Sequence, residues 1–200
     1  MSGAARWSVV VLVLAVAGAV ALWPRSSGPA DQGAPATRSR PGPDLATARE
    51  RAALRPCPQT PDAPGAPAQL RGVVIGCLGD GRPVDVAAAA PGRALVNFWA
   101  TWCVPCQGEL KVLEEYSREP GAAPVITVLV DSKEADGLEL MAKLGVRLPS
   151  VVDPDDAVRK AVRAPRTLPM SYVVGADGAL AQLTDPTVLT SVDQVREVVG

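Results

Sequence analysis

At the centre of the chain lies Ala94-Leu-Val-Asn-Phe-Trp-Ala-Thr-Trp-Cys-Val-Pro-Cys106, where an apolar run passes directly into a pair of cysteines. Residues 94–100 predict a buried strand, because the run is short and strongly apolar. An amphipathic pattern then predicts a helix over residues 103–118, which Glu119-Pro-Gly121 ends. The C-x-x-C pair is therefore expected at the turn from a strand into a helix.

A cysteine pair at the start of a helix has direct chemical consequences. The first turn of a helix has backbone N–H groups without partners and the positive end of the helix dipole, and both favour a thiolate. Cys103 is therefore the predicted nucleophile. Cys106 lies one helical turn further on and is the predicted resolving thiol, which attacks a mixed disulfide between Cys103 and a partner. Pro105 suits a first helical turn, because its missing N–H has no intrahelical partner to lose.

Three other interpretations of the C-x-x-C pair stay open, and the simplest is that these are two ordinary buried cysteines. The pair could be half of a zinc site that Cys57 and Cys77 complete, although their spacing fits no common zinc module. It could also be a purely structural disulfide, although so short a loop gains little chain entropy. We assign no metal and no cofactor to the chain.

Composition excludes several classes of function. Lysine and arginine number 20 against 21 acidic residues, so no charge excess indicates a nucleic acid partner. The 200 residues include no histidine, which excludes Ser-His and Cys-His nucleophile pairs and His-ligated zinc.

The N-terminus predicts export. An uncharged apolar run extends from Trp7 to Trp23, so residues 1–23 are expected to be a transmembrane anchor or a signal peptide. Ala19-Val-Ala21 has the small-x-small form of a cleavage site, although it lies inside the run, and a buried soluble helix is a third alternative. The first two interpretations place the rest of the chain outside the cytosol, as a single-pass protein of the cell membrane or as a secreted one.

Two further segments follow the apolar run. Residues 24–68 are rich in Pro, Ala, Gly and Ser, which predicts a linker, with a short helix over residues 44–55 that Asp44 caps and Pro56 ends. Residues 69–200 alternate strand and helix signals and are the predicted folded domain. Its expected elements are a hairpin of strands 70–77 and 82–86, strand 94–100, helix 103–118, strand 125–130, helix 132–144, strand 151–152, helix 156–162, a hairpin of strands 170–174 and 179–183, and helix 191–199. This order predicts an α/β domain with an N-terminal β-hairpin and a mixed central sheet that helices cover on both faces.

Two segments carry a resemblance to a known family. Asn97-Phe-Trp-Ala-Thr-Trp-Cys-Val-Pro-Cys106 resembles the active-site segment of the thioredoxin superfamily, in particular of the TlpA/ResA type of membrane-anchored thiol-disulfide oxidoreductases. Thr167-Leu-Pro-Met-Ser-Tyr-Val-Val-Gly-Ala-Asp-Gly178 is similar to the family's segment with a cis proline before a strand and a hairpin. The resemblance covers residues 70–200 and implies a thioredoxin fold.

The resemblance also implies roles for residues outside the dithiol. Pro169 matches the cis proline, which would pack against the sulfurs and leave the backbone of Leu168 free to pair with a substrate strand. Trp102, Leu168 and Pro169 are the expected substrate contacts. Glu109 matches the glutamate of the C-x-x-C-x-x-E pattern and would accept the proton of Cys106, unless it is an ordinary solvated helix residue.

The sequence departs from the family pattern at two places. Asn97 stands where many thioredoxins have a buried aspartate, so proton transfer cannot use that position. Leu110-Lys111 follows the glutamate, where the family often has a proline. These departures concern the rate of proton transfer and not the dithiol chemistry itself.

The two remaining cysteines, Cys57 and Cys77, are expected to form a structural disulfide outside the cytosol, worth about 3 kcal/mol of stability. The alternative is a second redox couple that passes electrons to Cys103 and Cys106.

The predicted function is thiol-disulfide exchange with exported cysteine-containing proteins. By resemblance, these would be apocytochromes c that await reduction or proteins in oxidative folding, and a membrane or extracytoplasmic redox partner would recharge the pair. The direction of electron flow stays open. The alternative function is a copper or zinc carrier that uses the same thiolates.

Overall fold

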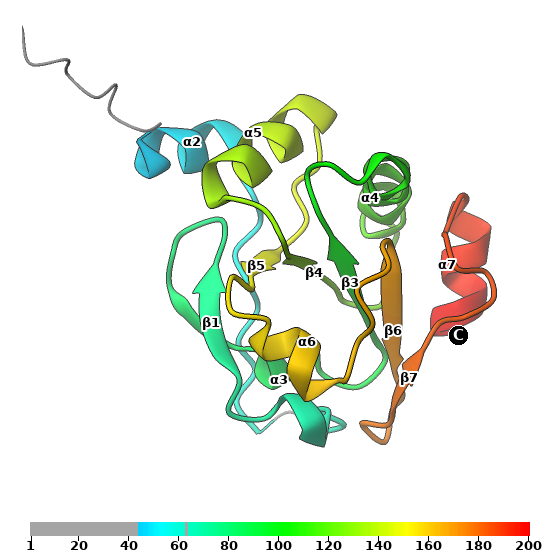
Figure 1. Ribbon diagram of the computed structural model, residues 1–200. Helices are drawn as coiled ribbons and strands as arrows, with labels where there is room; N and C mark the ends of the chain where they lie inside the picture. Colours follow the sequence, from blue (N-terminus) through cyan, green and yellow to red (C-terminus); the bar gives the residue numbers. More distant parts are fainter. Residues whose placement is uncertain (1–43, 63) are drawn as a thin grey trace, which may run out of the picture. The chain divides into compact units, whose positions relative to one another are not determined.

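The computed structural model describes residues 44–62 and 64–200, which belong to one compact unit (Figure 1). The predicted anchor or signal peptide at residues 1–23 lies outside the described residues, as does the linker up to residue 43. In the described part of the chain, no helix has the length and apolar character needed to cross a membrane.

The described residues form one seven-stranded mixed sheet in the order β2-β1-β5-β4-β3-β6-β7. Strands β3, β4 and β5 run parallel to one another, and the other neighbours pair antiparallel. The strands are β1 (Val74–Cys77), β2 (Pro83–Asp85), β3 (Ala94–Trp99), β4 (Val125–Leu129), β5 (Ser150–Val152), β6 (Met170–Val174) and β7 (Leu180–Gln182). The predicted mixed sheet is confirmed.

Helices cover both faces of this sheet (Figure 1). One face, which we call the α4 face, packs against α2 (Leu45–Ala52), α4 (Val104–Tyr116), α5 (Glu134–Leu144) and α7 (Val192–Val199). The other, the α3 face, packs against α3 (Val86–Ala89), α6 (Ala157–Ala161) and the 3-10 turn η1 (Ala68–Leu70). The sequence does not predict α3 or η1, because both are too short to show a periodic pattern.

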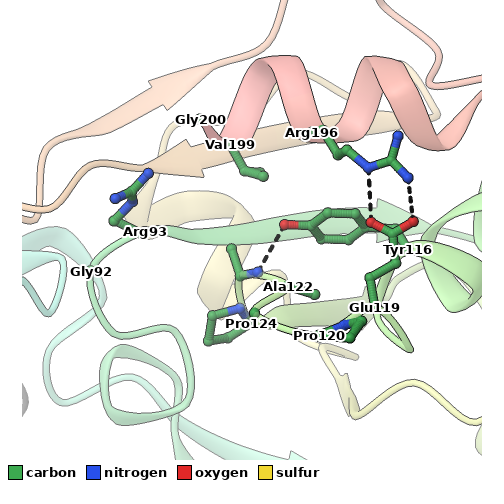
Figure 2. Close-up of a pocket in the computed structure, with 12 residues that line it drawn as sticks. Gly92, Arg93, Tyr116, Glu119, Pro120, Ala122, Pro124, Arg196, Val199 and Gly200 are labelled. Carbon is green, nitrogen blue, oxygen red and sulfur yellow. Dashed lines mark hydrogen bonds and ion pairs between the residues drawn. The ribbon is translucent and has the colours of Figure 1, made fainter.

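Helix α7 is linked to the segment that follows the C-terminus of α4 (Figure 2). This contact lies at the end of the sheet where β3 and β4 begin. The guanidinium of Arg196 donates to the carboxylate of Glu119 at 2.9 Å, and the hydroxyl of Tyr116 accepts from the backbone N–H of Ala123 at 2.8 Å. A cavity of about 540 Å³ lies between these elements. It is therefore at the opposite end of β3 from the cysteine pair.

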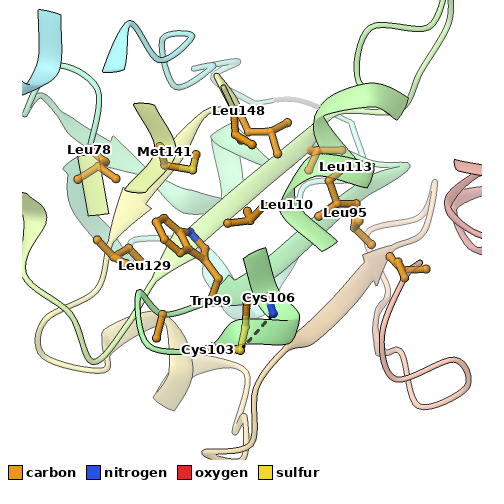
Figure 3. Close-up of a cluster of buried hydrophobic side chains, with 14 of the residues drawn as sticks. Leu78, Leu95, Trp99, Cys103, Cys106, Leu110, Leu113, Leu129, Met141 and Leu148 are labelled. Atoms are coloured by element: carbon orange, nitrogen blue, oxygen red, sulfur yellow. Dashed lines mark hydrogen bonds between the residues drawn. A yellow bond between two sulfur atoms is a disulfide. The ribbon is translucent and has the colours of Figure 1, made fainter. Parts of the chain in front are cut away.

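Strand β3 contributes to the core on both sides of the sheet. All six of its residues are buried, as expected for a central strand with helices on both faces. Leu95 and Trp99 pack on the α4 face together with both cysteines of the C-x-x-C pair (Figure 3). Val96 and Phe98 pack on the α3 face. This strand thus places the turn to α4 on a rigid base.

Helix α2 shows that part of the predicted linker packs on the domain. Asp44 caps the helix by accepting from the backbone N–H of Ala46, as the sequence predicts, but the helix ends at Ala52. Ala52 is buried in the α4-face core. Arg49 donates to the carbonyl of Leu78 at 3.1 Å and to Glu134 of α5 at 2.9 Å. Residues from 44 onward therefore belong with the fold that the sequence assigns to residues 69–200.

Candidate active site

Cys103 and Cys106 lie where β3 passes into α4, and a disulfide joins them with their Cα atoms 5.3 Å apart. Cys103 is the N-cap of α4, and its Sγ accepts from the backbone N–H of Cys106 at 3.3 Å (Figure 3). Pro105 lies in the first turn of the helix, where no intrahelical N–H bond is lost. Cys103 is 4% exposed and Cys106 0%, so Cys103 is the more accessible of the two.

Two exposed apolar side chains flank the buried sulfurs. Trp102 is 60% exposed and Val104 is 75% exposed, which is unusual for large apolar residues of a folded domain. The indole N–H of Trp102 donates to the carbonyl of Asp131 at 3.3 Å, which fixes the ring beside Cys103. An apolar surface around a reactive sulfur is suited to contact with another protein.

The strand register brings Pro169 to the same end of the sheet as the dithiol, where β3 ends and β6 begins. β6 runs antiparallel to β3 and pairs Met170 with Phe98, so the preceding residues lie opposite the end of β3. The Leu168–Pro169 peptide bond is cis. Leu168 packs against the α4-face core, which includes both cysteines. Thr167 and Leu168 also line a groove of about 350 Å³, with the loop after β7 as its other wall.

Glu109 lies in the interior and not in water. It is 2% exposed, and its carboxylate accepts from the side-chain amide of Asn97 at 2.7 Å and from the backbone N–H of Leu189 at 2.9 Å. Burial raises the pKa of Glu109 above its ordinary value of 4.5, while the bonds from Leu189 and Asn97 act in the opposite direction. The same amide of Asn97 also donates to the hydroxyl of Ser171 at 3.0 Å.

The hydrogen bonds of Glu109 and of Asn97 are not predicted from the sequence. Asn97 is recognised there only as a missing aspartate, whereas in the structure it holds the carboxylate of Glu109. Ser171 and Leu189 are 74 and 80 residues away from their respective partners Asn97 and Glu109. No local pattern marks such long-range contacts.

The other disulfide joins Cys57 and Cys77 and lies on the other side of the sheet. Their Cα atoms are 6.0 Å apart. Cys77 belongs to the α3-face core and Cys57 packs against it, whereas Cys103 and Cys106 belong to the α4-face core. The four sulfurs therefore do not converge on one four-thiolate zinc site, and the sheet separates the two disulfides.

Residues 66–183 match the model of the AhpC/TSA family, which is 59% of the chain by count (118 of 200 residues). The chain belongs to the AhpC/TSA family. Its predicted membership of the thioredoxin superfamily is confirmed, because the relatives of this AhpC/TSA protein include several named thiol-disulfide oxidoreductases.

Three relatives illustrate the similarity of this AhpC/TSA protein to others. The thiol:disulfide interchange protein CycY of Rhizobium leguminosarum bv. viciae is 31% identical over 102 residues, which are 49% of this chain and 53% of CycY. The thiol-disulfide oxidoreductase ResA of Bacillus subtilis (strain 168) is 24% identical over 114 residues, 56% of this chain and 63% of ResA. A thioredoxin of Mycolicibacterium smegmatis is 32% identical over 111 residues, 54% of this chain and 79% of that thioredoxin. The chain thus spans only part of the length of CycY and ResA.

Solved structures establish the fold of this AhpC/TSA protein. MTB DsbF superposes with a TM-score of 0.58 at 24% identity, over 67% of this chain and 96% of DsbF. A secreted Mycobacterium tuberculosis disulfide oxidoreductase homologous to E. coli DsbE superposes with a TM-score of 0.56 at 21% identity, over 66% of this chain and 96% of that chain. At these identities the likeness establishes the thioredoxin-like fold alone.

Proposed function

We propose that the chain exchanges disulfides with exported cysteine-containing proteins through Cys103 and Cys106. In the reducing direction, the Cys103 thiolate attacks one sulfur of a substrate disulfide, forms a mixed disulfide and releases the other substrate sulfur as a thiolate. Cys106 then attacks the sulfur of Cys103, which closes the Cys103–Cys106 disulfide and releases the second substrate thiol. In the oxidising direction, the same reaction steps run in reverse.

The observation that carries this proposal is the unequal environment of the two sulfurs. Cys103 lies at the N-cap, where the backbone N–H of Cys106 stabilises negative charge on its sulfur, and it retains some access to solvent. Cys106 is fully buried and can meet only a partner that is already attached to Cys103. Attack and resolution are thus divided between the two positions.

Further residues take supporting roles in this proposal. Glu109 follows Cys106 by three residues on α4 and accepts its proton before resolution. Its burial, which raises its pKa, supports the role of a proton acceptor. Trp102 and Leu168 contact the substrate, and Pro169 presents the backbone next to the dithiol.

The proposal includes a location outside the cytosol. Residues 1–23 anchor the chain in the cell membrane or direct its secretion, and the part of the predicted linker before residue 44 connects this segment to the domain. The Cys57–Cys77 disulfide supports an oxidising compartment, where such bonds persist. Substrates there would be apocytochromes c or proteins in oxidative folding, and a membrane or extracytoplasmic redox partner would recharge the dithiol.

Trapping a mixed disulfide tests the division of roles. With insulin as the probe, the reduced full-length chain with Cys106→Ser is expected to accumulate a covalent adduct, because Cys103 attacks but nothing resolves the product. The matched variant Cys103→Ser is expected to accumulate none. The measurement is a non-reducing gel, with release of the adduct by dithiothreitol. Equal adducts from the two variants, or none from either, would contradict the proposal.

A further inference from the structure

Four charged side chains form a closed ring beside the dithiol: Asp131, Arg159, Asp156 and Arg166. Arg159 lies 2.8 Å from the carboxylate of Asp131 and 3.0 Å from that of Asp156. Arg166 lies 3.5 Å from the carboxylate of Asp131 and 2.8 Å from that of Asp156. Each carboxylate therefore meets both guanidinium groups, and the charges balance within the ring.

The ring joins three separate loops. Asp131 follows β4, Asp156 precedes α6, and Arg166 lies between α6 and β6. Both aspartates have left-handed backbone conformations, with φ of 47° for Asp131 and 56° for Asp156. Residues other than glycine adopt this region rarely and keep it only where the surroundings hold them there. The ring provides such a hold for both loops.

Arg159 is the fixed member of the ring. It is 4% exposed, and a buried guanidinium is stable only when carboxylates pair with it. Its backbone N–H donates to the carboxylate of Asp153 at 3.1 Å, and the same carboxylate accepts from the backbone N–H groups of Ala157 and Val158. The backbone of Arg159 is thus held in the first turn of α6, and its buried side chain is the centre of the ring.

The ring is connected to Trp102 and to the segment before Leu168, the two residues that we propose as substrate contacts around Cys103 and call the two walls. The carbonyl of Asp131 accepts from the indole N–H of Trp102, which forms one wall. Arg166 stands two residues before Leu168, which belongs to the other wall and to the groove beside Pro169. A change in the ring would therefore move the two walls relative to each other without touching either sulfur.

We propose that this ring is a positioning device, which sets the separation of Trp102 and Leu168 and makes Asp131 and Arg166 determinants of substrate specificity. The inference rests on the proposed function. The ring neutralises its own charges, and none of the described residues that line the groove is ionisable. The surface therefore fits a protein segment with uncharged residues next to its cysteine. A small disulfide, which needs only the sulfur of Cys103, does not depend on the two walls.

Steady-state kinetics of the full-length chain tests the ring. The variants are Arg166→Gln and Asp131→Asn, whose side chains are 72% and 34% exposed and belong to neither hydrophobic core. Arg196→Gln is the matched control, because that arginine also makes carboxylate pairs but lies at the opposite end of β3. The probes are insulin, as a protein disulfide, and 2-hydroxyethyl disulfide, as a small one, and dithiothreitol is the reductant that restores the dithiol after each turnover.

Each ring variant is expected to raise KM for insulin about fivefold while kcat at saturation stays within about twofold of the wild type. The kinetic constants for 2-hydroxyethyl disulfide and those of the Arg196→Gln control are expected to stay unchanged. The double variant is expected to raise KM for insulin no more than the single variant with the larger effect, because both substitutions break the same ring. A merely structural role would lower the rates for both probes together.

The outcomes separate the ring from the proposed function. An active wild type whose ring variants keep the wild-type KM for insulin, or lose activity equally on both probes, would overturn the ring's role alone. A wild type that is inactive on both disulfides would overturn the proposed function and this inference with it.

Discussion

At the scale of single residues, the most informative group is Glu109 with its partner Asn97. A carboxylate that is 2% exposed loses hydration, and two hydrogen bonds replace only part of it, so its pKa is raised. Asn97 contributes one of these bonds from the middle of β3. Its Oδ1 atom is buried without a hydrogen-bond partner among the described residues. An amide turned over by half a rotation would offer Oδ1 to a protonated Glu109, so the pair is suited to both protonation states.

We predict that Glu109→Gln removes a pH dependence of stability. A carboxyl whose pKa is raised in the folded state adds stability that is fully present below pH 4.5, the pKa of the group in the unfolded chain. This stability is lost as the pH rises through the pKa of the group in the folded state. The wild type should therefore lose stability relative to Glu109→Gln as pH rises from about 4.5. Urea unfolding over a pH series measures this, with Glu115→Gln, an exposed position of the same helix, as control. Parallel curves for the wild type and Glu109→Gln would rule the effect out.

At the scale of elements, the apolar periodicity of the sequence predicts β3, β4 and α4 to within two residues at each end. It does so because a buried strand and an amphipathic helix are local patterns. The packing of α2 is different. Pro and Ala dominate the surrounding residues 24–68, and nothing in that composition shows that Ala52 and Arg49 meet α5 and the β1–β2 turn. The ring around Arg159 is not predicted either, because its members pair across three loops and no local pattern of the sequence marks such pairs.

We predict that docking of α2 contributes to the stability of the domain. Ala52→Asp places a charge in the α4-face core without a partner, and should lower the free energy of unfolding by about 2–4 kcal/mol. The same substitution at Ala46, which is exposed in the first turn of α2, should leave it within about 0.5 kcal/mol of the wild type. Chemical denaturation of both full-length variants measures the difference. If the two substitutions cost the same, α2 does not pack on the core in solution.

At the scale of the whole molecule, the sheet divides two kinds of disulfide chemistry. The Cys103–Cys106 pair lies on the α4 face at the start of a helix, next to exposed apolar side chains. The Cys57–Cys77 pair lies on the α3 face and joins the segment after α2 to β1. Direct exchange between two disulfides requires sulfur to reach sulfur, and the layer of strands between the two faces does not permit it. The arrangement favours a structural role for Cys57–Cys77 over a relay of electrons.

The double variant Cys57→Ser/Cys77→Ser tests this separation. Loss of a cross-link over a sequence separation of 20 residues should lower the free energy of unfolding by about 3 kcal/mol, because the unfolded chain regains conformational freedom. The reduction potential of the Cys103–Cys106 pair should change by less than about 30 mV, since the sheet isolates it from the substitution. Urea unfolding under oxidising conditions gives the first quantity, and a redox titration of the folded chain gives the second. If the double variant were fully stable but could no longer be recharged by its reductant, Cys57 and Cys77 would be electron carriers and the two faces would have to communicate.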